Sequence, residues 1–146
     1  MSSAPASMRS MDQRVSFVTL PVADRARSRA FYVDGLGWEP LFDGIDVLMF
    51  RVGERLVLSL WDEAGFEAEV GPVRRGEGHP PVTLAHNLAT EAEVDAVVAS
   101  ARAAGAEVRE PTRREWGGYS GYVFDPDGVP WEIAVNPGDD FGFLVP

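Results

Sequence analysis

The sequence predicts an α+β protein made of two tandem βαβββ modules, whose strands form a curved mixed sheet around a cleft. The same order of strand and helix signals occurs twice, over residues 14–62 and 81–137. A short stretch is also repeated, since VTLP at 18–21 resembles VTLA at 82–85. Such self-similarity indicates a duplicated unit, and each sheet needs a partner to bury its open side. The 15 glycines and 11 prolines among 146 residues favour strands and turns over a helical bundle.

The first module begins with residues 15–22, where apolar and polar side chains alternate as in a strand with one buried face. Asp24 has the residue type of a helix N-cap, and we expect this helix to continue to about Val33. The sequence Gly35-Leu36-Gly37 ends the helix. Its expected apolar stripe consists of Ala26, Ala30 and Val33. Three short strands are then expected, at residues 38–42, 46–52 and 55–61.

The second module follows residues 63–80, which are rich in charge, glycine and proline, have no clear period and are therefore expected to be a linker. Residues 82–88 form its first expected strand, and Thr90 with Glu93 forms a capping box at the start of a helix. This helix ends at Gly105. Its apolar stripe consists of Val94, Val97, Val98 and Ala101. Three more strands are expected at residues 107–110, 118–124 and 129–135.

The last two strands are joined by Asp125-Pro126-Asp127-Gly128, whose residue types suit a type I turn closed by a glycine bulge. If Asp125 faces Val129 across this turn, then Tyr122 lies opposite Glu132. Glu132 alternates with apolar neighbours, so the strand has one apolar face and one face that carries a carboxylate. This carboxylate is either exposed to solvent or presented into the cleft.

The composition excludes several classes of protein. No cysteine occurs, which excludes disulfides, thiolate catalysis and zinc–thiolate sites. The net charge of -10 argues against nucleic acid and anionic membrane surfaces as partners. No apolar run approaches the length of a membrane span. Residues 1–13 lack the apolar core of a signal peptide, so we expect tails at 1–13 and 138–146 and a cytoplasmic protein.

With these elements in order, the chain resembles the vicinal oxygen chelate superfamily, which includes glyoxalase I, the bleomycin-resistance proteins, fosfomycin-resistance transferases and extradiol dioxygenases. The resemblance rests on the AD-x-A-x-S-x-x-FY run at 23–32, the LGWEP segment at 36–40 and the DPDG-x-x-WE run at 125–132. It covers residues 14–137, and it implies a single domain with two modules around a cleft. It implies little about function, because one scaffold carries many chemistries.

Members of that superfamily that use a metal ion place four ligand positions in the cleft. The resemblance implies that these positions are occupied here by Phe17, Ser59, Thr83 and Glu132. A divalent ion requires several carboxylate or imidazole ligands, and only Glu132 offers one. We therefore expect no cofactor, with a divalent metal ion as the alternative.

His86 keeps the metal alternative open. Counting from the helix cap at Thr90 places His86 under the helix, as a hydrogen-bonded structural residue. Counting from Gly105 places it at a ligand position in the cleft, where its partner would be Glu132. The other histidine, His79, lies in the linker and is expected to be solvated.

If positions are counted from the helix cap at Thr90, the cleft is aromatic and weakly polar with one carboxylate. This profile fits a flat or amphipathic ligand. Trp116 and Tyr119 lie on a glycine-rich approach that would form a loop over its mouth. The side chains expected to face the cleft are Phe17, Thr19, Met49, Ser59, Trp61, Thr83, Ala85, Tyr122 and Glu132.

Three functions remain open. The first is a metal-independent protein that binds or sequesters a small molecule, such as a drug or a cationic aromatic compound, and so confers antibiotic resistance. The second is a metal-dependent lyase, isomerase or dioxygenase that uses His86 and Glu132. The third is a metal-free enzyme in which Glu132 acts as general base. The resemblance also implies a homodimer, which would cover the exposed sheet edges.

Overall fold

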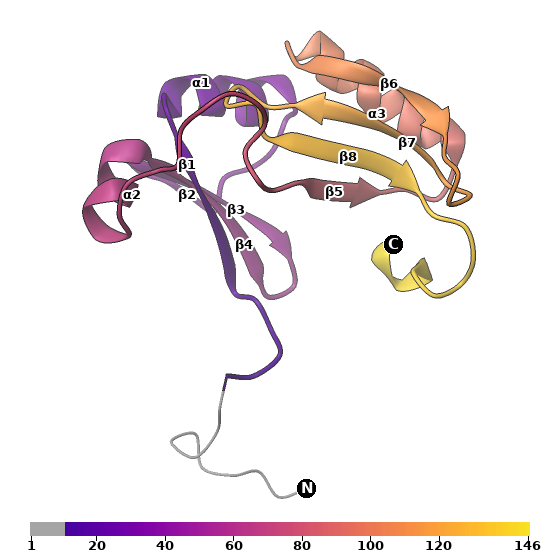
Figure 1. Ribbon diagram of the computed structural model, residues 1–146, viewed down its shortest axis with the longest axis horizontal. Coiled ribbons are helices and arrows are strands. Elements are labelled where there is room, and N and C mark those ends of the chain that lie inside the picture. Colours follow the sequence, from indigo (N-terminus) through magenta and orange to yellow (C-terminus); the bar gives the residue numbers. More distant parts are fainter. Residues whose placement is uncertain (1–10) are drawn as a thin grey trace, which may run out of the picture.

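The computed structural model describes residues 11–146 as two four-stranded mixed sheets (Figure 1). The first sheet has the strand order β1-β4-β3-β2, and the second repeats it as β5-β8-β7-β6. In each sheet only the first pair, β1 with β4 and β5 with β8, is parallel. The predicted α+β class and its two repeated modules are therefore confirmed. Residues 1–10 of the expected N-terminal tail lie outside the described residues.

The elements follow the predicted order, and their bounds differ from the predicted ones: β6 is longer, β3 and β4 are shifted by one residue, and the other strands are shorter. The first module contains β1 (Phe17–Val22), α1 (Arg25–Arg29), the π-helix η2 (Ala30–Gly35), β2 (Phe42–Asp43), β3 (Val47–Gly53) and β4 (Leu56–Asp62). The helix α2 (Glu63–Glu69) lies between the modules. The second module contains β5 (Leu84–Asn87), α3 (Glu91–Ala103), β6 (Glu107–Arg113), β7 (Tyr119–Phe124) and β8 (Pro130–Val135). The short 3-10 helix η3 (Gly142–Leu144) follows it, within the expected C-terminal tail. Within residues 11–146, no helix has both the length and the apolar character needed to cross a membrane.

The first helix begins as predicted but buries a different face. The Asp24 carboxylate accepts hydrogen bonds from the amides of Ala26 and Arg27, at 3.0 and 3.3 Å, and so caps α1. The predicted apolar stripe is wrong in part, because Ala26 and Ala30 are exposed, whereas Val33 is half-buried and packs against the core. The helix widens into π-helical geometry at Ala30, which changes the angular spacing of its side chains. The buried residues are Ser28, Phe31 and Tyr32.

The expected linker is wrong in part, because its first residues form α2. This helix packs beside the end of β4, where the rings of Phe66 and Trp61 lie 6.1 Å apart at an angle of 71°. Arg75 then turns back to the helix and forms ion pairs with Glu63 and Glu67. A helix of only two turns with one large apolar residue has too short an apolar period to be recognised in sequence.

The second helix is as predicted. Thr90 Oγ1 accepts a hydrogen bond from the amide of Glu93 at 3.2 Å, which caps α3. Gly105 follows the helix with a φ of 102°, the left-handed conformation that ends many helices. Of the predicted stripe, Val94, Val98 and Ala101 are buried and Val97 is half-buried.

The hairpin between β7 and β8 has the predicted register, with Tyr122 opposite Glu132. Its turn is closed by hydrogen bonds from the Asp125 amide to the Val129 carbonyl at 3.1 Å and from the Gly128 amide to the Asp125 carbonyl at 2.9 Å. Gly128 has a φ of 79°, which favours glycine at this position. The Asp125 carboxylate also accepts the amide of Val129 and so holds the turn from inside.

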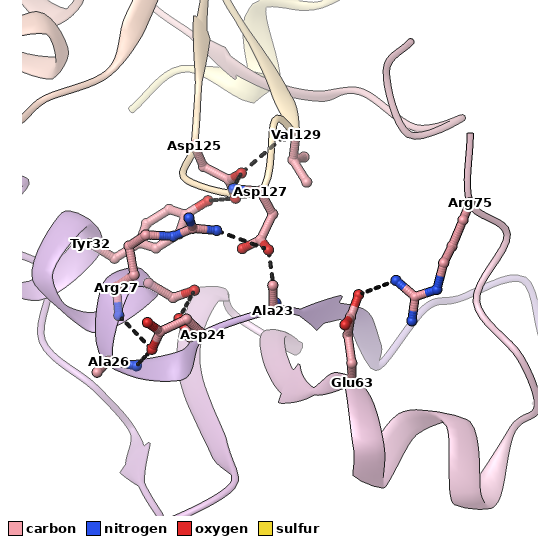
Figure 2. A network of polar contacts seen from close by, with 11 residues as sticks. Ala23, Asp24, Ala26, Arg27, Tyr32, Glu63, Arg75, Asp125, Asp127 and Val129 are labelled. Carbon is pink, nitrogen blue, oxygen red and sulfur yellow. Dashed lines mark hydrogen bonds and ion pairs between the residues drawn. The ribbon is translucent and has the colours of Figure 1, made fainter. Parts of the chain in front are cut away.

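The turn of this hairpin joins the two modules (Figure 2). The Tyr32 hydroxyl of the first module donates to Asp125 Oδ2 at 2.7 Å and accepts from Trp131 Nε1 at 2.9 Å. Asp127 Oδ1 accepts from the amide of Ala23 at 2.9 Å, next to the start of α1. Tyr32 is 0% exposed and Asp125 is 5% exposed, so this polar joint lies within the core.

The two sheets share one core and leave their other faces outside it. Side chains on the helix-covered faces, such as Leu20 and Leu58 in the first sheet and Val123 and Ile133 in the second, belong to one buried cluster. The face of β1–β4 opposite α1 is called here the first open face, and the face of β5–β8 opposite α3 the second open face. Because side chains alternate along strands, both open faces point away from the common core. No hydrogen bond, ion pair or ring contact within residues 11–146 joins the two open faces.

Candidate functional site

The second open face carries a polar row that crosses all four strands. Ala85 is in register with Glu132, Glu132 with Tyr122, and Tyr122 with Arg109. Side chains in register on neighbouring strands point to the same side, so these four lie next to one another. The Tyr122 hydroxyl donates to Glu132 Oε2 at 3.3 Å, and both side chains are half-buried. The small Ala85 leaves space on the other side of Glu132.

The charges around Tyr122 are of both signs. Burial raises the pKa of Tyr122, and the charge of Glu132 and the hydrogen bond to it raise it further, while Arg114 and Arg109 act in the opposite sense. Tyr122 therefore stays protonated at neutral pH and donates to Glu132. Arg114 lies beside it, with its guanidinium carbon 5.9 Å from the centre of the Tyr122 ring. Arg114 is fixed there by bonds from Nε to Ser120 Oγ at 2.9 Å and from Nη2 to the Ser120 carbonyl at 2.8 Å.

Part of the connecting segment lies on the same face. The ring of His79 stacks on Phe124, with the centres 5.1 Å apart and an angle of 16°. Arg109 also lies against Phe124, with its guanidinium carbon 5.1 Å from the centre of the ring. Its Nη2 is 3.1 Å from His79 Nε2. Because a guanidinium can only donate, His79 Nε2 accepts this bond, and a neutral His79 carries its proton on Nδ1. His79 is exposed, as expected from sequence, but it is held in place on the sheet.

The first open face is mostly apolar. Its central row consists of Thr19, Ser59, Met49 and Phe42, which are in register across the four strands. Ser59 is only 3% exposed, whereas Phe42 is 53% exposed. Phe17 lies on the same face, two residues before Thr19 at the start of β1, and is 54% exposed. Trp61 lies at the other end, where Phe66 of α2 covers it.

The predicted site residues therefore fall into two groups on different faces. Phe17, Thr19, Met49, Ser59 and Trp61 share the first open face. Thr83, Ala85, Tyr122 and Glu132 share the second, where Thr83 Oγ1 donates to the Pro130 carbonyl at 3.1 Å.

Tyr119 and Trp116 lie away from both groups. Tyr119 lies on the helix-covered side and donates to Asp95 of α3 at 2.6 Å. Trp116 lies in the turn between β6 and β7, where its ring covers Gly118. Tyr119 therefore belongs to the packing of α3 and not to a loop over the site.

The sequence interpretation missed three residues of the second open face, namely His79, Arg109 and Arg114. Arg109 pairs with Tyr122, but the register between β6 and β7 shifts between Arg109 and Thr112. Counting from the hairpin therefore fails beyond this β-bulge. The position of Arg114 depends on the turn that follows β6, and His79 lies outside any strand. The run of arginines near the end of β6 was the one available signal.

The residues of the chain do not fit the divalent metal ion that the sequence analysis kept as an alternative. Of the four presumed ligand positions only Glu132 carries a metal-binding side chain, and no three His, Cys, Asp or Glu residues within 11–146 come together as a metal site. His86 is in register with Ile133, whereas its neighbour Ala85 is in register with Glu132. His86 and Glu132 therefore point to opposite sides of the sheet.

His86 lies at the helix-covered side, as counting from Thr90 predicts. It lines a cavity of about 200 Å³ between the modules, together with Phe31, Trp38, Val97 and Trp131. The predicted side-chain hydrogen bond is wrong, because the His86 ring makes none within residues 11–146. The strand β5 has only four residues, and His86 is exposed.

The fold and this site define a class of protein. The sequence model of the Glyoxalase/Bleomycin resistance protein/Dioxygenase superfamily matches residues 14–133. The chain therefore belongs to this superfamily, and the resemblance seen in the sequence is confirmed. A comparison with curated proteins returned no match.

Solved structures share the fold. A glyoxalase-related enzyme from Fulvimarina pelagi has a TM-score of 0.77 and 36% identity, over 86% of this chain and 89% of that chain. The hypothetical protein SA1046 from S. aureus has a TM-score of 0.73 and 26% identity, over 87% and 96% of the two chains. A lactoylglutathione lyase from Agrobacterium tumefaciens has a TM-score of 0.66 and 24% identity, over 86% and 96%. The last similarity shows the fold alone.

Proposed function

We propose that the chain is a small-molecule-binding protein of the glyoxalase/bleomycin-resistance type that holds its ligand without a metal ion. The observation that carries this proposal is the second open face, where Glu132 and the Tyr122 hydroxyl lie 3.3 Å apart beside the small Ala85. A half-buried carboxylate with one fixed donor leaves further acceptor positions for a ligand. The two groups orient a ligand, and neighbouring aromatic and apolar atoms supply the contact area.

The ligand-binding cleft in this proposal is completed by a second copy of the chain. The second open face is polar, whereas the first open face presents the exposed rings of Phe17 and Phe42. Within one chain the two faces point away from their common core, so one chain alone does not bring them together. A homodimer that places the first open face of one copy over the second open face of the other encloses Glu132 between polar and aromatic walls. It also covers the exposed phenylalanine rings.

The ligand in this proposal is a flat or amphipathic molecule of drug size. Phe17 and Phe42 offer rings for stacking, and Glu132 offers a charged acceptor for an ammonium, amide or hydroxyl group. Sequestration of a toxic compound requires no reacting group, so a role in antibiotic resistance is consistent with this site. Thr19, Ser59 and Thr83 contribute hydroxyl groups at its edges.

The experiment that tests this proposal uses protein purified without added metal and dialysed against a chelator. Elemental analysis is expected to show less than stoichiometric Ni, Zn, Mn or Fe. The same sample is titrated with a panel of aromatic amines, acids and neutral drugs, and binding is followed by tryptophan fluorescence. Saturable binding by at least one compound supports the proposal. Stoichiometric metal that survives dialysis, or binding that appears only after a metal is added, contradicts it.

A further inference from the structure

We propose that the second open face contains an anion-binding subsite formed by Arg109 and Arg114, so that the ligand carries a carboxylate, phosphate or phosphonate group. This inference rests on the proposed function for the place of the ligand, and it adds the chemistry at one end of it. Glu132 lies in the same row, two strands away from Arg109. With neighbouring strands about 4.8 Å apart, the acidic group and the group bound by Glu132 are separated by roughly 10 Å.

Both arginines are on the ligand side of the sheet and have donors to spare. Arg109 is in register with Tyr122, and Arg114 lies over the Tyr122 ring. A guanidinium has five N–H donors. Arg114 uses one N–H from Nε and one from Nη2 for Ser120, and Arg109 uses one for His79. The remaining donors have the forked geometry that binds carboxylate and phosphate oxygens in pairs.

Neither of these arginines forms an ion pair within residues 11–146, although carboxylates are abundant. Arg51, Arg55 and Arg74 also form no ion pair within these residues, whereas Arg109 and Arg114 are the two that lie beside Tyr122. Other arginines do have such partners: Arg25 and Arg29 pair with Asp43, Arg27 with Asp127, Arg75 with Glu63, Arg102 with Glu110 and Arg113 with Glu91. Arg109 and Arg114 instead bond only to neutral groups, which fix their positions and leave their charge unneutralised.

His79 acts in this proposal as a positioning residue. Its ring and the Arg109 guanidinium cover Phe124 together, and the bond between Nε2 and Nη2 at 3.1 Å fixes the plane of the guanidinium. Stacking on Phe124 alone would leave Arg109 free to rotate away from the row. The connecting segment thus contributes to the site through His79, without contacting the ligand itself.

The test measures the affinity of matched aromatic probes by isothermal titration calorimetry at low salt. Phenylphosphonate and benzoate are the anionic probes, and benzylammonium is the cationic one. We expect the anions to bind to the parent protein, and both Arg109→Gln and Arg114→Gln to weaken that binding roughly tenfold or more. The matched control is Arg55→Gln, which removes the same charge from an exposed position in the turn between β3 and β4. The control is expected to bind the anions as the parent does.

A second pair of variants separates positioning from folding. His79→Phe keeps a ring that can stack on Phe124 but lacks the acceptor for Arg109, so it is expected to weaken anion binding while leaving the melting temperature unchanged. Glu132→Gln is expected to weaken benzylammonium and to leave anion binding intact.

The outcomes distinguish this inference from the proposed function. Binding of benzylammonium with no binding of either anion overturns the anion subsite and leaves the proposed function in place. Anion affinities that are unchanged in both Arg109→Gln and Arg114→Gln overturn it as well, since the anions then bind elsewhere. Absence of saturable binding by probes of either charge, at concentrations up to solubility, overturns both.

Discussion

The hydrogen bonds that Tyr32 makes between the two modules give the most detailed prediction. Tyr32→Phe removes one hydroxyl that takes part in two hydrogen bonds, to Asp125 Oδ2 at 2.7 Å and from Trp131 Nε1 at 2.9 Å. A hydrogen bond to a charged group contributes roughly 1.5–3 kcal/mol, and a buried donor left without an acceptor costs about 1–3 kcal/mol. Trp131 is only half-buried, so water can replace part of the second bond. We expect the free energy of unfolding to fall by about 3 kcal/mol.

The assay is thermal unfolding followed by circular dichroism, with urea unfolding as a check. For a domain of this size a loss of about 3 kcal/mol lowers the melting temperature by roughly 6–12 °C. The matched control is Tyr119→Phe, which removes a hydroxyl bonded to Asp95 at 2.6 Å in an exposed position. This control is expected to cost less than about 1 kcal/mol. If Tyr32→Phe and Tyr119→Phe lower the melting temperature equally, the Tyr32 joint does not hold the modules together as described.

The same variant has a predicted dependence on pH. Burial raises the pKa of Asp125 above its ordinary value, while the bond from Tyr32 lowers it by favouring the ionised carboxylate. The cost of burying the ionised group is present above the folded pKa and is relieved as the pH falls through that value. Because the Tyr32 bond acts on the ionised form, the difference in stability between parent and Tyr32→Phe is expected to shrink in acid. An unchanged difference between neutral and acidic pH would show that Asp125 is not the partner that matters.

Three further predictions concern the ligand site, the assembly and the packing of the helices. Glu132→Gln is expected to weaken binding of a cationic or donor ligand by about ten- to a hundredfold while leaving the melting temperature unchanged, and equal affinities in a titration would remove Glu132 as the anchor. Light scattering is expected to give twice the 15.9 kDa mass of one chain, and Phe17→Glu, on an exposed apolar face, is expected to shift this towards the single chain. A parent protein that scatters as a single chain at micromolar concentration would count against the dimer. Gly35→Ala places a methyl group 2.7 Å from the Ala104 side chain and is expected to cost about 1–3 kcal/mol in urea unfolding, whereas Gly142→Ala meets no atom within 4 Å and is expected to cost less.

The sequence predicted the parts of the fold that depend on local chemistry. The Asp125-Pro126-Asp127-Gly128 turn has a residue type suited to each position, so the register of the hairpin and the pairing of Tyr122 with Glu132 could be counted. The caps at Asp24 and Thr90 are likewise local, because each side chain bonds amides two or three residues away. The duplication was visible because both modules keep the same order of such signals.

The parts that were missed depend on contacts between distant residues. Tyr32, within the π-helix that begins at Ala30, bonds Asp125 and Trp131, which lie about a hundred residues away in the chain. The β-bulge beyond Arg109 shifts the register, so the guanidinium could not be placed by counting from the hairpin. The relative direction of the two open faces likewise follows from the packing of the modules and has no local sequence signal.

The central claim is that the second open face binds a small molecule without a metal ion. The most direct test is the dissociation constant of one ligand, chosen from the panel, for chelator-treated protein and for the same protein after addition of Ni, Zn, Mn or Fe. The structure predicts equal dissociation constants, because Glu132 belongs to no group of three or more metal-binding side chains within residues 11–146. Binding that is absent from the chelated protein and restored by one of these ions would contradict the account.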